Sequence, residues 1–138
     1  MKLFSIIITM SFFIASGAQA SSLETQLQQL KSFSAKDLQE DKKRTDKSKL
    51  KIDEMFDTLE ALNKTLEKEV PSVELLREAC RVAELTYAND PTEYSAELLL
   101  PTYQRHKDLF LKVFTKSQYE RCRSSLKNAE REEKSGNG

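Results

Sequence analysis

The chain contains very little glycine and histidine. Its three glycines lie at positions 17, 136 and 138, and His106 is the single histidine among 138 residues. A phosphate-binding glycine loop and an EF-hand calcium loop each need a glycine inside the loop, so both are excluded. Any zinc, acid-base or nucleophilic site that depends on histidine has to use His106.

The helical neighbours of His106 supply no catalytic partner. Tyr103 and Phe110 share its face, whereas Asp108, two residues on, points about 200° away from it on a helix. We therefore expect no enzyme, no catalytic residue, no metal ligand and no cofactor. The alternative is a small secreted hydrolase that combines His106 with acidic residues distant in the sequence.

Tryptophan is absent and only three prolines occur, while leucine, lysine, glutamate and alanine dominate the chain after residue 20. This composition is typical of helices rather than of short strands joined by turns. We expect an all-α fold, a small antiparallel helical bundle of five or six helices. Residues 21–130 form one domain, and residues 131–138 are expected to be a disordered tail.

Residues 1–20 have the pattern of a cleaved signal peptide. Lys2 supplies the positive start, residues 3–16 are largely apolar, and Ala18-Gln19-Ala20 is a signal-peptidase site. About 14 apolar residues are too few to cross a bilayer, which takes roughly 20. We expect a mature chain that starts at Ser21, is periplasmic or secreted, and has no stable membrane insertion after cleavage.

The chain has two cysteines, Cys80 and Cys122. An even number in an exported protein indicates one disulfide, and the 3-4 spacing of apolar residues places Cys80 on the buried face of its helix. No Cys-x-x-Cys is present, so the predicted bond is structural rather than redox-active. It would staple the third helix to the last and stabilise the fold by about 4 kcal/mol.

Four polar residues, each with an acidic residue in the following turn, predict the starts of helices: Ser34, Ser72, Asp90 and Ser117. Pro91 at the first helical position supports the helix after Asp90. Pro101 predicts a kink or a fresh helix start. The run from Gln39 to Lys49 has no apolar residue, and we expect a solvated helix there, with a linker as the alternative.

Positive and negative charges balance but are distributed unevenly. The 22 basic and 22 acidic residues give a formal net charge of zero, so nucleic acid is not an expected partner. Residues 53–97 nevertheless carry 12 acidic and 4 basic side chains, whereas residues 98–138 carry 5 acidic and 9 basic ones. The blocks either neutralise each other within the fold or offer an acidic face to a basic partner, or the reverse.

The candidate partner-binding residues are of three kinds: basic, acidic and aromatic. They are Lys42, Lys43, Arg44 and Lys47, then Glu74, Glu78 and Glu84, and finally Tyr87 and Tyr94. The tyrosines flank a predicted turn, where an aromatic ring can anchor a partner.

These observations predict an exported, non-catalytic protein-binding module of the bacterial cell envelope. An inhibitor or immunity protein and a periplasmic chaperone or adaptor are two versions of this function. The expected partner is another envelope or secreted protein, and a homodimer is an option because residues 34–70 have the length and charge of a dimerising coiled coil. The alternative is a structural or secretion-system subunit that self-assembles.

Overall fold

The computed structural model describes residues 22–46 and 49–136. Within these ranges all regular secondary structure is helical, with seven α-helices, one 3-10 helix and no strand. The predicted all-α fold is confirmed, and the helices pack as a small bundle. The predicted signal peptide and Lys47 lie outside the described residues.

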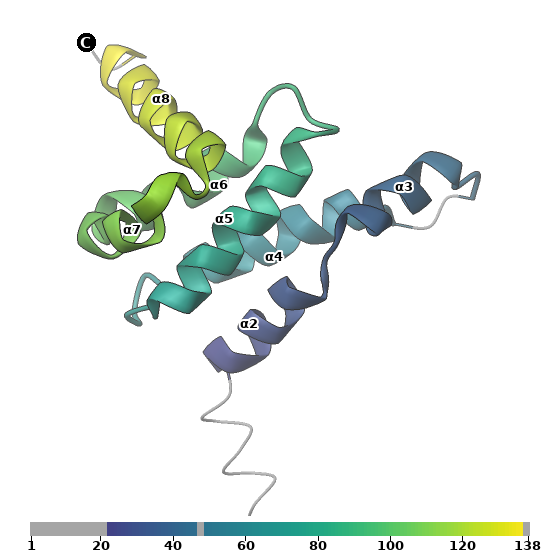
Figure 1. Ribbon diagram of the computed structural model, residues 1–138, viewed down its shortest axis with the longest axis horizontal. Helices are drawn as coiled ribbons and strands as arrows, with labels where there is room; N and C mark the ends of the chain where they lie inside the picture. Colours follow the sequence, from purple (N-terminus) through teal and green to yellow (C-terminus); the bar gives the residue numbers. More distant parts are fainter. Residues whose placement is uncertain (1–21, 47–48, 137–138) are drawn as a thin grey trace, which may run out of the picture.

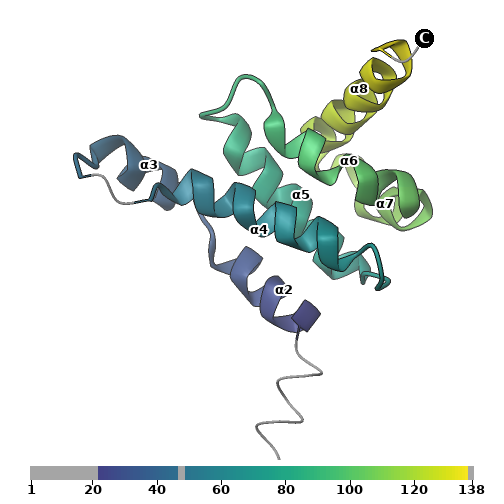
Figure 2. The ribbon, with the colours of Figure 1, turned by 180° about the vertical axis from the view of Figure 1, so that it is seen from behind.

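The chain has an N-terminal and a C-terminal group of helices (Figures 1 and 2). The first comprises α2 (Ser22–Ser32), α3 (Ala35–Lys43), α4 (Lys51–Thr65) and α5 (Val73–Tyr87). The second comprises α6 (Tyr94–Arg105), α7 (Lys107–Val113), the 3-10 helix η1 (Thr115–Ser117) and α8 (Glu120–Gly136). The two groups pack against each other mainly through α4 with α6 and α5 with α7. The end of α3 and the C-terminal half of α8 extend away from the body in different directions.

The core lies between α4 and α5 and the helices packed on them. Helix α5 contacts α2, α4, α6, α7 and α8, which makes it the most central element. Its buried residues include Leu76, Cys80 and Val82, which are fully buried, as are Leu59 of α4 and Phe110 of α7. The apolar face of each helix points toward this core. Burial of these side chains is the main contribution to the stability of the fold.

Two arginines close the C-terminal ends of other helices. Arg81 of α5 donates to the carbonyl oxygens of Leu30 at 2.7 Å and Phe33 at 2.9 Å, at the end of α2. Arg105 of α6 donates to the carbonyl oxygen of Leu66 at 3.0 Å, just after α4. The Leu30 carbonyl also accepts from the Phe33 N–H at 3.2 Å, and in both places the positive charge of the arginine matches the helix dipole.

Two acidic residues accept hydrogen bonds from backbone N–H groups at the N-terminal ends of other helices. The Asp41 carboxylate of α3 accepts from the backbone N–H groups of Lys51 at 2.8 Å and Ile52 at 3.0 Å, at the start of α4. Glu84 of α5 accepts from the N–H of Cys122 at 3.0 Å, in the first turn of α8. Helix ends are therefore tied together across the bundle by side chains from neighbouring helices.

Two of the four predicted helix starts are confirmed. The Ser34 N–H donates to Asp37 Oδ2 at 2.9 Å, as expected for a capping box before α3. Ser72 Oγ accepts from the Leu75 N–H at 3.1 Å before α5. In both cases the cap residue has an extended backbone and the helix follows directly.

The other two predicted starts are wrong. Asp90 binds the N–H groups of Thr92 and Tyr94 instead of capping a helix at Pro91, and α6 begins at Tyr94 after Glu93 adopts a φ of 56°. Ser117, with a φ of 60°, belongs to η1, and α8 begins at Glu120. In each case the residues that were predicted to form the first turn of a helix form a separate turn before the helix begins.

The helix lengths also differ from the predictions. Five or six helices were expected, but the chain breaks at His106, whose φ of −128° and ψ of 43° separate α6 from α7, while Pro101 lies inside α6. Helix α3 ends at Lys43 instead of reaching Lys49. Helix α8 continues to Gly136 through residues expected to form a tail, because Glu, Arg and Lys are good helix formers even when fully exposed.

Candidate functional site

An apolar groove of about 320 Å³ lies where the start of α2 meets the turn between α4 and α5. Leu23 and Leu27 of α2, Val70 of the turn and Leu75 of α5 line it, with Glu24 and Ser72 at its edges. We call it the α2–α5 groove. Both elements lie at the lower edge of Figure 1. Val70 is 74% exposed, the highest value among the large hydrophobic side chains that the structure describes.

The local sequence explains why this groove stays open. Leu23 and Leu27 are only half-buried, whereas Leu30, one turn further along α2, is fully buried in the core. Helix α4 has ended at Thr65, and Pro71 is buried while Ser72 caps α5. The chain is therefore fixed on both sides of Val70, and the valine side chain is left at the surface.

Four acidic residues lie in or directly beside the segments that line the groove, Glu24, Glu67, Glu69 and Glu74, and we call them the acidic rim. Glu24 lines the groove, and Glu67 and Glu69 belong to the turn that carries Val70. Lys31 donates to Glu74 at 2.7 Å, and this hydrogen bond lowers the pKa of Glu74. The four carboxylates stand against three lysines, Lys31 paired with Glu74 and Lys64 and Lys68 beside Glu67 and Glu69, so a small excess of negative charge remains.

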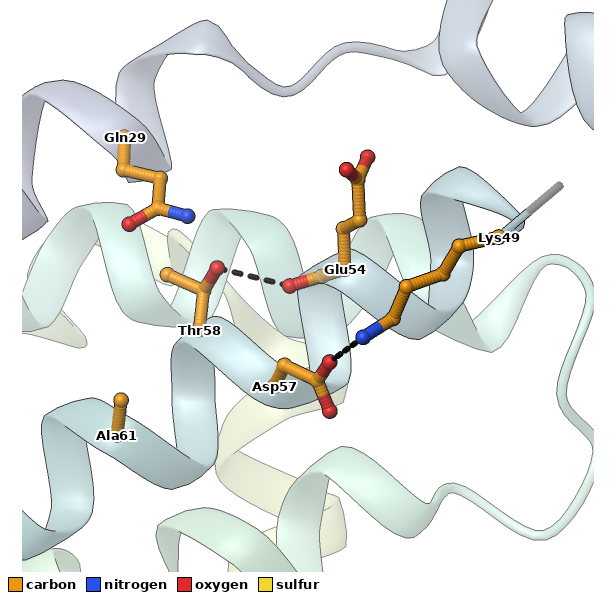
Figure 3. A pocket seen from close by; sticks show the side chains of 6 residues that line it. All are labelled: Gln29, Lys49, Glu54, Asp57, Thr58 and Ala61. Atoms are coloured by element: carbon orange, nitrogen blue, oxygen red, sulfur yellow. Dashed lines mark hydrogen bonds and ion pairs between the residues drawn. The ribbon is translucent and has the colours of Figure 1, made fainter.

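A second groove, of about 370 Å³, lies between α2 and α4 and is shown in Figure 3. Its lining is mostly polar: Gln29, Lys49, Glu54, Asp57, Thr58 and Ala61. Lys49 is hydrogen-bonded to Asp57, which raises the pKa of Lys49, and Thr58 Oγ1 donates to the carbonyl of Glu54 at 2.8 Å. Lys49, Asp57 and Thr58 are therefore already engaged in hydrogen bonds within the groove.

The predicted basic residues are used in part by the fold. Lys42 and Lys43 are exposed in the last turn of α3. Arg44 donates to the carbonyl oxygen of Lys49 at 2.6 Å and lies 3.9 Å from Asp46, so it holds the linker that follows α3. Of the three predicted basic residues that the structure describes, Lys42 and Lys43 remain as surface charges that a partner could meet.

The predicted acidic and aromatic residues do not form one surface. Glu78 pairs with Arg81 at 3.1 Å and Glu84 holds α8, so both are part of the scaffold. Tyr87 is 3% exposed, lies beneath the Arg121 guanidinium at 5.0 Å from the ring centre, and its burial raises its pKa. As a buried residue it cannot anchor a partner, whereas Tyr94 is 42% exposed. Glu74 belongs to the acidic rim described above.

The two cysteines lie side by side in the core, between α5 and α8. Both are fully buried, and Cys122 Sγ lies 2.7 Å from Cys80 Sγ as one free thiol beside another. The predicted disulfide is therefore not present in the structure, although the two helices it was expected to join are correct. Burial raises the pKa of Cys122, which favours its protonated thiol form within the fold.

His106 lies at the break between α6 and α7. Its Nε2 atom is buried without a hydrogen-bond partner, and the neighbouring cavity is lined by Gln104, Arg105, Lys107 and Asp108. In residues 22–46 and 49–136, no three His, Cys, Asp or Glu side chains are arranged to hold a metal ion. Nor does any helix in those ranges have the length and apolar character to span a membrane.

Sequence reasoning missed the α2–α5 groove. Leu23 and Leu27 follow the ordinary pattern of an amphipathic helix, which predicts burial rather than a groove. Val70 is the sequence feature that could have indicated the groove. An aliphatic residue directly before a proline at a helix end has no helical face on which to be buried.

Comparison of the chain with protein-family models, curated proteins and solved structures gives no match. Its function is therefore argued from its own residues.

Proposed function

We propose that this chain is an exported, non-catalytic protein-binding module of the bacterial cell envelope, with the α2–α5 groove as its contact surface. The observation that carries the proposal is the exposed Val70 beside a groove walled by Leu23, Leu27 and Leu75. Exposed apolar patches on charged proteins mark interaction sites, because covering them removes apolar surface from water. Burial of a valine side chain contributes about 1.5–3 kcal/mol.

An inhibitor or immunity protein and a periplasmic chaperone or adaptor both fit this proposal, since each acts by holding one partner. Export through the leader at residues 1–20 is part of it. The self-assembling subunit is the weaker alternative, because pairing two copies through the groove would bring two acidic rims together.

We also propose that export converts the thiols of Cys80 and Cys122 to a disulfide. Their sulfur atoms are adjacent and lie on two different helices, which supports this step. The oxidant would be the disulfide of an envelope oxidoreductase: the two thiols lose two protons and two electrons, the S–S bond forms, and the oxidoreductase is left as a dithiol.

Export and oxidation are tested on the full-length precursor produced in a bacterium and recovered from the periplasm. Intact-mass and N-terminal analysis should give a chain that starts at Ser21 and lacks two hydrogen atoms relative to the same sample after reduction. A retained leader would contradict export with cleavage. Alkylation of both cysteines without prior reduction would contradict the disulfide.

The binding proposal is tested by affinity capture from envelope and supernatant fractions with three forms of the mature chain. These are the unmodified protein, Val70→Asp in the groove, and Leu111→Asp as the matched control. Leu111 is also an exposed aliphatic residue, at 63%, but it lies on α7, outside the groove. One stoichiometric protein should be retained by the unmodified chain and the control and be lost with Val70→Asp.

The proposal fails if all three forms retain that protein equally, because the groove is then not the contact. It fails more broadly if each form recovers only itself. The circular dichroism of Val70→Asp must match that of the unmodified chain, as expected for a change at so exposed a position.

A further inference from the structure

We infer that the ligand of the α2–α5 groove is a basic protein segment that inserts aliphatic side chains between α2 and α5 and places lysine or arginine beside them. This inference rests on the proposed function and adds to it the chemistry of the partner. It follows from the combination of apolar groove walls with the acidic rim in one place.

Two residues of the acidic rim lie at helix N-termini. Glu24 and Glu74 lie in the first turns of α2 and α5, where the positive end of each helix dipole stabilises a carboxylate. Glu67 and Glu69 are exposed on the turn before Val70. A partner that covers Val70 must therefore come close to several negative charges.

The same charges argue against other occupants. A second copy docked about a two-fold axis would bring each acidic rim against its equivalent, and like charges across an interface are unfavourable. An anionic membrane surface would be repelled for the same reason. The basic side chains of a cationic protein segment are attracted by the acidic rim. Its apolar side chains are removed from water by the leucine and valine side chains that line the groove.

The shape of the groove indicates how such a segment binds. Leu23 and Leu27 are one helical turn apart on α2, and Leu75 and Val70 form the opposite wall. An amphipathic helix that presents apolar side chains one turn apart can place them along these walls, as in other helix-in-groove contacts. Its flanking basic residues would then lie over Glu24 and Glu69.

The test uses two synthetic helical peptides with the same leucine face. One carries lysines beside the leucines and the other carries glutamates at the same positions. Binding to the mature chain is measured by fluorescence anisotropy at low and at moderate salt. We expect the lysine peptide to bind about tenfold more tightly at low salt, with the ratio falling as salt screens the rim.

Two charge variants locate the effect. Reversing the rim with Glu24→Lys and Glu69→Lys should abolish or invert the preference between the peptides. The matched control reverses two exposed acidic residues elsewhere, Glu97→Lys on α6 and Glu132→Lys on α8, and should leave the preference unchanged. Sedimentation analysis of the unmodified chain should give a monomer at the concentrations used.

Equal binding of both peptides, lost together with Val70→Asp, would overturn the charge inference and leave the groove as the contact surface. Failure of both peptides to bind would overturn the inference. Failure of the proposed function would appear separately, because capture of the partner protein would then be insensitive to Val70→Asp. A dimer that Val70→Asp dissociates would assign the groove to a second copy instead.

Discussion

Arg81 Nη2 lies 2.7 Å from the carbonyl oxygen of Leu30, so a side chain of α5 closes the end of α2. The same guanidinium reaches Phe33 and is oriented by Glu78 on its own helix. Helix α2 carries the Leu23 and Leu27 wall of the groove. The position of that wall therefore depends on one arginine more than 50 residues away in the sequence.

Replacing Arg81 should destabilise the fold. Arg81→Met keeps much of the side-chain bulk but leaves the Phe33 carbonyl without a donor and the Leu30 carbonyl with only the Phe33 N–H, so the free energy of unfolding should fall by about 2 kcal/mol in urea titrations. Arg123→Met is the control, since Arg123 is exposed on α8 and should change stability by less than about 0.5 kcal/mol. Equal losses in both variants would show that Arg81 contributes only as a surface charge.

Asp41 should contribute more to the stability of the fold than Glu40, the acidic residue beside it. Asp41→Ala removes the acceptor for two N–H groups at the start of α4 and should lower the free energy of unfolding by about 1 kcal/mol. Glu40 is its exposed neighbour on α3, and Glu40→Ala should have almost no effect. Thermal unfolding of both variants makes the comparison, and a null result for Asp41→Ala would contradict the cap.

Asp90 should give the fold a component of stability that is lost in acid. Burial acts to raise its pKa, but hydrogen bonds from Thr92 and the Tyr94 N–H outweigh burial and lower the pKa below the usual value. A carboxylate whose pKa is lowered by folding contributes stability above about pH 4, which is lost as pH falls through the lower folded value. Because Asp90 is mostly solvated, the contribution is about 0.5–1 kcal/mol.

Asp90→Asn tests this dependence. The difference in unfolding free energy between the unmodified chain and the variant should be largest at neutral pH and should shrink as the pH falls below about 4. Asp108→Asn, at an exposed position on α7, is the reference for non-specific charge effects. A difference that stays constant across this range would exclude Asp90 as the source.

Reduction should weaken the exported protein. If Cys80 and Cys122 are joined after export, a reductant should lower the free energy of unfolding by about 4 kcal/mol, the value that the chain-entropy model gives for a loop of this length. The double variant Cys80→Ala with Cys122→Ala should unfold at the same denaturant concentration with and without reductant. A reductant effect of equal size in both proteins would contradict the bond.

Local chemistry could be predicted from the sequence, and contacts between distant residues could not. Ser72 next to Pro71 specifies a helix start within four residues, and the apolar period around Cys80 specifies which face of α5 is buried. Asp90 has the same type of signal as Ser72, but its carboxylate finds closer N–H groups in its own turn. A capping residue predicts where a helix can start and does not exclude a competing turn.

The contacts of Asp41, Glu84 and Arg81 depend on how helices meet in space. Their partners lie 10 to 51 residues away, so no periodicity could distinguish these side chains from ordinary surface charges. Glu78, Glu84 and Tyr87 were expected on a binding surface for this reason. Val70 shows the reverse case, a residue that looks incidental in the sequence and becomes the most exposed wall of a groove.

The two ends of the described chain lie far from each other in the structure (Figures 1 and 2). Helix α2 begins within a residue of Leu23, whereas α8 ends on a separate projection. A protein fused ahead of α2 would crowd the groove, but a dye, bead or sensor surface attached beyond α8 would leave it open. The orientation in which this molecule is immobilised therefore decides whether a ligand can reach it.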